Sequence, residues 1–217
     1  MKPLVVLVLE GEYRLTGAVL FCLGQADDIE VHVVQQAAAS PYQYSRYVRS
    51  HHRYAPELPE AGFVDFVRDV ATDVNAAVLL PVDVAGMRWA IRHAAALAPE
   101  LRCLPLPTAE AYETAADKSR LADFMRAHHI DGPDTLLDIT RDYQGNLAAL
   151  RFPVLLKPVD GAGGQGIARY ETPETLRPAV AALPEGARYI IQTYLEGYDI
   201  DCNVLCHNGQ EIGRAHV

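Results

Sequence analysis

The chain has 217 residues, of which 50% are hydrophobic, and a formal net charge of -9 at pH 7. This length and hydrophobic fraction are sufficient for one large or two small domains with buried cores. The acidic balance is unlike that of a nucleic-acid-coating surface, and no segment approaches the length of a membrane span, so we expect neither nucleic acid nor membrane as a partner.

The N-terminal sequence MKPLVVLVLEGEY contains a short apolar core. Acidic residues follow this core where a signal peptide would need a small-residue cleavage site, so the pattern predicts a first strand and a cytoplasmic protein. The four cysteines are scattered at positions 22, 103, 202 and 206. Their spacing provides no dense disulfide framework, and we expect reduced thiols buried in strands or helices.

Strand and helix patterns alternate through the first half of the chain. Apolar runs predict strands, and apolar residues at helical spacing predict helices. The strands are expected at 4–9, 29–34, 76–80 and 101–104, and the helices at 15–23, 63–74 and 84–97. This alternation predicts an α/β fold with an open, mostly parallel sheet covered on both faces, and ligands at the carboxyl ends of the strands. Pro105 and Pro107 then indicate a domain boundary.

Two acidic residues follow the predicted strands and are candidates for binding a small substrate: Glu10 after the first strand and Asp83 after the third. The alternative is that they begin ordinary loops. The basic segment 46–53, with sequence RYVRSHHR, lies in the connection between Gln35 and Glu60. It could meet an anionic group, but a solvated, mobile loop is the favoured interpretation.

The second half of the chain begins with a helical pattern from Ala109, in which Asp117 is placed to cap a turn that starts at Lys118. Gly132-Pro133 ends this pattern. Further elements are predicted as a helix that begins at Thr172-Pro173, strands at 189–195 and 200–206, and a hairpin turn at Asn208-Gly209 that leads into a last strand.

A glycine-rich loop lies within residues 152–170, FPVLLKPVDGAGGQGIARY. Gly161, Gly163 and Gly166 satisfy G-x-G-x-x-G, which indicates a dinucleotide site only where the loop follows a strand and opens a helix. The residues between Gly166 and Pro173 are too few and too mixed to start a long helix, so we predict strand, loop, strand. Such a loop can direct backbone N–H groups at phosphate oxygens, and the alternative is a mobile hairpin tip.

The distribution of basic residues singles out one lysine. The chain has 16 Arg but three Lys, at positions 2, 118 and 157, and Lys157 ends the apolar run before the glycine loop. A compact ammonium that must reach a phosphate would explain a lysine at this place.

Four segments, taken in order, resemble the ATP-grasp superfamily. They are DKSRL at 117–121, IDGPDT at 130–135, FPVLLKPVDGAGGQGI at 152–167 and IQTYLEGYD at 191–199. The resemblance extends from about residue 108 to the end of the chain. It implies a Rossmann-like pre-ATP-grasp domain at 1–107, the α+β lid subdomain of the module at 108–197, and the start of an incomplete C-terminal subdomain at 198–217. The module would then be truncated, as in a fragment of a longer protein.

The resemblance also implies a set of ATP-binding residues. Lys118 and Lys157 match the family lysines that contact the phosphates of ATP, and the glycine loop matches the one that closes over them. Gln192 matches the position, usually Glu, that meets the adenine amino group. The remaining matches are Gly161, Gly163, Gly164 and Gly166 in the loop, Thr193 and Leu195 for backbone contacts to the ring, and Asp199 for the ribose.

The chemistry implied is that of an ATP-dependent ligase, most similar to carboxylate-amine ligases or carbamoyl-phosphate-synthase-like enzymes. ATP would convert a small-molecule carboxylate into an acyl phosphate, which an amine then attacks to form a carbon-nitrogen bond, without a catalytic side-chain nucleophile. The family places Mg²⁺ on an acidic residue and a Glu-x-Asn motif, which we expect beyond residue 217, so this chain would be inactive alone. A homodimer is compatible with the resemblance. The alternatives are a non-catalytic ATP-binding or regulatory module and a dinucleotide-binding oxidoreductase domain.

Overall fold

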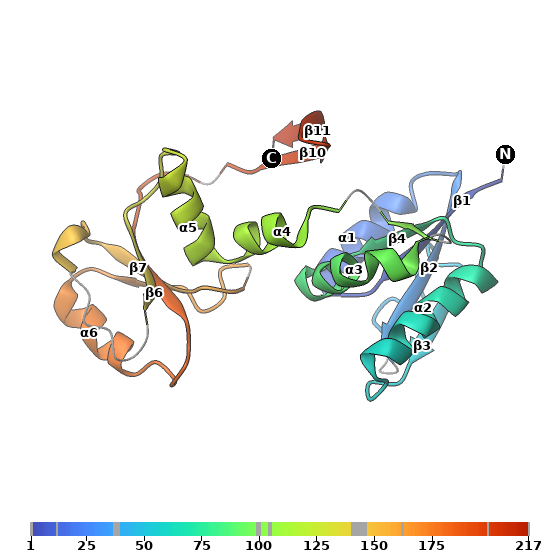
Figure 1. The fold of residues 1–217 in the computed structure, drawn as a ribbon, viewed down its shortest axis with the longest axis horizontal. Coiled ribbons are helices and arrows are strands. Elements are labelled where there is room, and N and C mark those ends of the chain that lie inside the picture. Colours follow the sequence, from blue (N-terminus) through green and yellow to red (C-terminus); the bar gives the residue numbers. More distant parts are fainter. Residues whose placement is uncertain are drawn as a thin grey trace. The chain divides into compact units, whose positions relative to one another are not determined.

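The computed structural model describes residues 2–11, 13–36, 40–98, 101–103, 106–139, 147–161, 163–198 and 200–216. The chain divides into two compact units, unit 1 from Met1–Ala109 and unit 2 from Glu110–Val217 (Figure 1). Each unit has its own hydrophobic core, so each is described by itself.

Unit 1 is an α/β structure built on a parallel sheet. Its described elements are β1 (Leu4–Leu9), α1 (Tyr13–Leu23), β2 (Ile29–Gln36), β3 (Ser50–Tyr54), α2 (Glu60–Asp73), β4 (Val78–Pro81), α3 (Val84–Leu97) and β5 (Arg102–Cys103). The described strands form one sheet in the order β3-β2-β1-β4-β5, and each neighbouring pair is parallel. The open parallel sheet expected from the alternating pattern is therefore confirmed.

The central strand β1 buries side chains on both faces of this sheet, which explains its continuous apolar run. Leu7 and its alternate neighbours pack with residues of α2 and α3 in one core. Val6 and Val8 lie in a second core with Leu20 of α1. The helices thus cover both faces of the sheet, as the sequence pattern predicted.

Strand β3 corrects the interpretation of the basic segment 46–53 as a mobile loop. Residues Ser50–Tyr54 form a strand that pairs in parallel with β2, with His51 opposite Val33 and His52 opposite Val34. This strand is too polar for a hydrophobic pattern to reveal it. Its backbone hydrogen bonds to a buried neighbour hold it at the sheet edge, where polar side chains are common.

Unit 2 combines short helices with antiparallel strands. It begins within helix α4 (Ala109–Ala116), whose first residue belongs to unit 1. Its further described elements are α5 (Lys118–Ala127), β6 (Thr135–Ile139), the 3-10 helix η1 (Leu147–Ala149), β7 (Val154–Pro158), β8 (Ala168–Tyr170), α6 (Pro173–Ala181), β9 (Tyr189–Thr193), β10 (Cys202–His207) and β11 (Gln210–His216). Strand β6 was not predicted, because its short apolar run directly follows the Gly132-Pro133 stop signal.

The main sheet of unit 2 has the strand order β6-β9-β7-β8 among the described residues, and its pairs are antiparallel. Val154, Leu156 and Ile191 point to one face and pack with Leu176 and Val180 of α6. Because side chains alternate along a strand, Leu155, Lys157 and Gln192 lie on the opposite face. This alternation separates an apolar core from a half-buried polar surface.

Strands β10 and β11 form an antiparallel hairpin. Its turn residues Asn208 and Gly209 have φ values of 50° and 75°, the left-handed conformation that an Asn-Gly hairpin turn requires, and the prediction of this turn is confirmed. Cys202 and Cys206 are exposed on β10, as is Cys22 in unit 1. The expectation that these three thiols are buried is therefore wrong.

Candidate functional site

The glycine-rich loop connects β7 and β8, two antiparallel neighbours. It therefore has the predicted strand-loop-strand arrangement and lacks the helix that a dinucleotide fingerprint requires. Gly161, Gly163, Gly164 and Gly166 have φ values of 113°, 65°, 76° and 73°, which L side chains rarely adopt. A Cβ at any of the first three would meet no described atom within 4 Å. The loop is therefore open at these three glycines, which are required by backbone conformation, not by crowding.

Lys157 lies at the end of β7 and faces Gln192 on the neighbouring strand β9. The Lys157 Nζ donates a hydrogen bond of 2.8 Å to Gln192 Oε1. Gln192 Nε2 in turn donates to Thr135 Oγ1 at 3.0 Å, and the Thr135 hydroxyl donates to the Pro133 carbonyl at 2.8 Å. Three strands and the segment before β6 thus contribute to one polar row.

The donors and acceptors in this row determine the orientation of the Gln192 amide. An ammonium can only donate, so Lys157 requires the amide oxygen of Gln192. The Thr135 proton is directed to the Pro133 carbonyl, so Thr135 accepts from the amide nitrogen. The face opposite α6 therefore presents a cationic donor, Lys157 Nζ, directly beside an acceptor, Gln192 Oε1.

Lys118 is the first residue of α5 and reaches the beginning of the glycine loop. Its Nζ donates to the Gly161 carbonyl at 2.9 Å and to the Val159 carbonyl at 3.4 Å. Its backbone N–H also donates to the Val159 carbonyl, at 3.1 Å. The structure therefore brings together Lys118, the glycine loop and the strand that carries Lys157, although Lys118 is 43 residues from Gly161.

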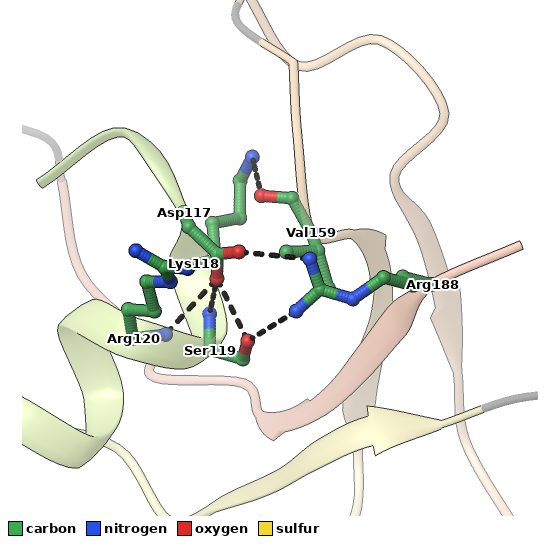
Figure 2. Close-up of polar contacts among 6 residues, drawn as sticks. All are labelled: Asp117, Lys118, Ser119, Arg120, Val159 and Arg188. Atoms are coloured by element: carbon green, nitrogen blue, oxygen red, sulfur yellow. Dashed lines mark hydrogen bonds and ion pairs between the residues drawn. The ribbon is translucent and has the colours of Figure 1, made fainter. Parts of the chain in front are cut away.

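An ion pair between the buried Asp117 carboxylate and the half-exposed Arg188 guanidinium holds the helix end that carries Lys118 (Figure 2). Asp117 Oδ1 accepts from the N–H groups of Ser119 and Arg120, as predicted for an N-cap, and from the Ser119 hydroxyl. Arg188 Nη1 contacts Asp117 Oδ2 at 3.0 Å. Burial alone would raise the pKa of the Asp117 carboxyl, but the hydrogen bonds from Arg120 and Ser119 and the Arg188 charge together lower this pKa to about 2.

The residues predicted to contact the adenine ring and the ribose differ in their exposure. Thr193 is buried, and its backbone N–H already donates to the Asp134 carbonyl at 2.9 Å, so a ring contact from its backbone would use its carbonyl. Leu195 is 58% exposed. Asp199 lies outside the described residues.

In unit 1, Glu10 and Asp83 follow the neighbouring strands β1 and β4. Helices α1 and α2 lie on opposite faces of the sheet, so this pair of strands is its topological switch point, where parallel sheets bind ligands. The Asp83 side chain caps α3 by accepting from Gly86 N at 2.8 Å, and Glu10 accepts from the Ser40 hydroxyl at 2.5 Å. A Cβ on Gly11 would lie 2.5 Å from Asp83 Cγ, so the backbone after β1 packs directly on Asp83.

The basic segment 46–53 has local partners in unit 1. His51 Nδ1 is 2.7 Å from Gln35 Oε1, and His52 Nε2 is 2.7 Å from Ser50 Oγ. Burial lowers the pKa of both histidines, which favours their neutral forms. These two residues are therefore poorly suited to bind an anion by charge.

Unit 2 also contains a cavity of about 490 Å³ between α5 and β6. Its lining includes Met125, residues 129–136, Leu150 and Gln192. The two lysines are not part of this lining, so the cavity reaches the polar row only at Gln192 and Thr135.

None of the described helices is long and apolar enough to cross a membrane. No group of three or more His, Cys, Asp or Glu side chains in the described ranges could hold a metal ion, so no described residue is assigned to Mg²⁺.

Sequence reasoning missed two residues of this site, Thr135 and Arg188. Thr135 ends the IDGPDT segment, so its neighbourhood was recognised but its contact with Gln192 was not. Arg188 is 71 residues from Asp117, and no local pattern links them. Only the pairing of distant segments reveals this ion pair.

Comparison with known proteins identifies the class of protein to which the site belongs. Residues 115–212 match the family model of the ATP-grasp domain. This match covers the part of the chain in which the sequence motifs resemble the ATP-grasp superfamily.

The particular proteins that the chain resembles include an ATP-grasp enzyme, a ligase and a synthetase. The ATP-grasp enzyme fsqD of Aspergillus fumigatus is 29% identical over 107 residues, which are 45% of this chain and 18% of that protein. The L-amino acid ligase of Bacillus licheniformis matches with a TM-score of 0.66 and 15% identity, over 91% of this chain and 45% of that chain. The N5-carboxyaminoimidazole synthetase of Staphylococcus aureus, solved with ADP, matches with a TM-score of 0.63 and 13% identity, over 93% and 50%.

These likenesses confirm the predicted fold class, a parallel α/β sheet followed by part of an ATP-grasp module. The chain spans at most about half the length of these relatives. The assignment of 108–197 to the lid and of 198–217 to the next subdomain stays a prediction.

Proposed function

We propose that this chain is the ATP-binding front part of an ATP-dependent ligase. The observation that carries the proposal is the convergence of Lys118, Lys157 and an open glycine loop in unit 2. Both ammonium groups bond to uncharged oxygens in the described structure, and phosphate oxygens are stronger acceptors for them. The backbone N–H groups of the loop supply further donors for phosphate oxygens.

The polar row on β7 and β9 favours adenine as the base. The imidazole-side edge of adenine presents an acceptor, N7, beside a donor, the N6 amino group, whereas guanine presents two acceptors, N7 and O6. Lys157 Nζ and Gln192 Oε1 are a donor and an acceptor 2.8 Å apart, which complements adenine. Guanine would place O6 against the Gln192 oxygen. The substitution of Gln for the more usual Glu retains the acceptor that adenine needs.

The chemistry proposed is activation of a carboxylate. The γ-phosphoryl group passes from ATP to a carboxylate oxygen, which gives ADP and an acyl phosphate, and an amine then attacks the acyl carbon and displaces phosphate. Lys118, Lys157 and the loop N–H groups would position the phosphates and stabilise their charge, so no side-chain nucleophile is needed. Mg²⁺ would neutralise phosphate charge when bound.

Glu10 and Asp83 are proposed to contact a small substrate in unit 1. Their position at the switch point of a parallel sheet supports this, and two carboxylates suit an amine. The homodimer and the cytoplasmic location stay predictions.

Calorimetric titration of the 217-residue chain with MgATP tests the binding proposal. Lys157→Met and Lys118→Met should each weaken binding by about 2 kcal/mol, or roughly thirtyfold, because each removes a charge-assisted hydrogen bond. Lys2→Met, which removes the third lysine, is the matched control. Circular dichroism should show an unchanged fold in all three variants.

Other outcomes would contradict the proposal or narrow it. Absent MgATP binding, or tighter binding of NADH, would contradict it. Phosphate release from ATP, measured with pooled carboxylic acids and amines in any longer protein that contains this chain, would support the ligase. ATP binding without phosphate release in such a protein would favour a regulatory module.

A further inference from the structure

Arg188 contacts the end of α5 through its side chain and the start of the glycine loop through its backbone. Its guanidinium contacts Asp117 Oδ2 at 3.0 Å and Ser119 Oγ at 3.2 Å. Its carbonyl accepts the Val159 N–H at 3.0 Å. Figure 2 shows the guanidinium directed at both side chains of the helix end.

These contacts close a ring that includes Lys118. The Val159 carbonyl accepts the backbone N–H of Lys118, Lys118 follows Asp117 in sequence, and Asp117 returns to Arg188 through the ion pair. The ring therefore joins the first turn of α5, the end of β7 and the start of β9. A change at Arg188 would alter the position of Lys118 relative to the loop residues Val159 and Gly161.

The chemistry of the ring favours arginine over lysine. Asp117 is 5% exposed, and a buried carboxylate is costly unless it is paired and hydrogen-bonded. A planar guanidinium can donate to Asp117 and Ser119 at once through separate nitrogens, as Arg188 does, whereas a lysine ammonium is a single point charge. Arg188→Lys would keep the charge beside Asp117 and lose the two-pronged geometry.

We propose that Arg188 is a positioning residue that sets the place of the Lys118 ammonium relative to the glycine loop, acting through Asp117 and Ser119. This inference rests on the proposed ATP site for its functional consequence. Its structural part concerns Lys118 itself and can be measured without nucleotide.

The first experiment measures the reactivity of the lysines. Brief acetylation followed by mass spectrometry resolves each site, because the chain has three lysines and each Arg→Lys substitution adds a single new one. Arg188→Lys should raise the labelling rate of Lys118 several-fold and leave Lys2 and Lys157 unchanged. Arg177→Lys, an exposed change on α6, is the matched control. Ser119→Ala should produce a smaller rise, because it removes one contact of the guanidinium and keeps the ion pair. Thermal melts of each variant test whether it is folded.

The second experiment is a double-mutant cycle with MgATP. Arg188→Lys should weaken binding about tenfold in the wild-type background, a coupling typical of residues in one network. In the Lys118→Met background the same change should have no further effect. An equal effect in both backgrounds would overturn the inference, because Arg188 would then contact the nucleotide itself.

The two experiments separate the inference from the proposed function. Unchanged Lys118 labelling in a folded Arg188→Lys variant would overturn the positioning role, whatever nucleotide binds. Altered labelling together with absent MgATP binding in the wild type would support the positioning role and contradict the proposed ATP site.

Discussion

Units 1 and 2 each use strands to hold functional side chains, but the strands differ in what their two faces contact. In unit 1, β1 is buried on both faces and its polar residue Glu10 lies beyond the strand end. In unit 2, β7 and β9 bury one face against α6 and present Lys157 and Gln192 on the other. The comparison indicates that the parallel sheet can contact ligands at the carboxyl ends of its strands. The antiparallel sheet can instead contact a ligand with the side chains of one of its two faces.

The polar groups of the two units also have different partners. Asp83 caps a helix, so part of its hydrogen-bonding capacity maintains the fold of unit 1. Lys118 donates to backbone carbonyls and Lys157 to an amide oxygen, acceptors that carry no formal charge. A charged phosphate oxygen is a stronger acceptor for an ammonium than these carbonyl and amide oxygens.

The largest expected effect tests whether the two cores are independent. Leu7 in unit 1 and Leu176 in unit 2 are both 0% exposed, and each belongs to a different core. Replacing either by Ala should cost about 3 kcal/mol, through lost burial and the cavity left behind. Trp89, the single tryptophan, packs on Phe63 within unit 1, so its fluorescence reports unit 1.

Urea unfolding followed by Trp89 fluorescence and by circular dichroism distinguishes the two variants. Leu7→Ala should shift the fluorescence transition to lower urea. Leu176→Ala should leave the fluorescence transition unchanged. It should shift to lower urea only the part of the circular dichroism transition that comes from unit 2. A fluorescence transition that moves equally in both variants would break the comparison of two separate cores.

A smaller effect is expected from the buried carboxylate of unit 2. The pKa of Asp117 is lowered from 3.8 to about 2, so its ionised form stabilises the folded state. The contribution is complete above about pH 5 and is lost as the pH falls through 3.8 towards 2, a total of about 2 kcal/mol. Asp117→Asn should remove this pH dependence, as measured by urea unfolding between pH 5 and pH 2.

The matched control is Asp123→Asn, which changes an exposed carboxylate of the same helix. The difference between the two variants isolates the buried group. The same loss of stability in acid for Asp117→Asn and for the wild type would show that the Asp117 ion pair contributes nothing to the pH profile.

The smallest effect concerns the glycine loop. Gly164 and Gly186 share a φ of +76°, and neither would place a Cβ within 4 Å of a described atom. Alanine at either position should cost about 1 kcal/mol of stability through backbone strain alone. Because only Gly164 lies in the loop, only Gly164→Ala should also weaken MgATP binding in calorimetry. Equal MgATP affinities in the two variants would remove the loop from the proposed site.

Much of the architecture could be predicted because local patterns encode it. The apolar run of β1, the helical spacing of α3 and the Asn208-Gly209 turn each follow from side chains within a few residues of one another. The N-cap role of Asp117 is also local. Strands β3 and β6 were missed because β3 is polar and β6 follows a stop signal, and both are held by ladders to strands that are distant in sequence.

The sequence by itself determined the order of the elements other than β3 and β6, the ATP-grasp motifs and the positions of the two lysines. Only the tertiary structure decided which residues hold them, because those contacts join groups far apart in the chain. Thr135 meets Gln192 across 57 residues, and Arg188 meets Asp117 across 71. Hydrophobic periodicity extends over single elements, so it cannot specify such pairs. They form only when β6, β9 and the start of α5 are brought together by a shared core and backbone hydrogen bonds.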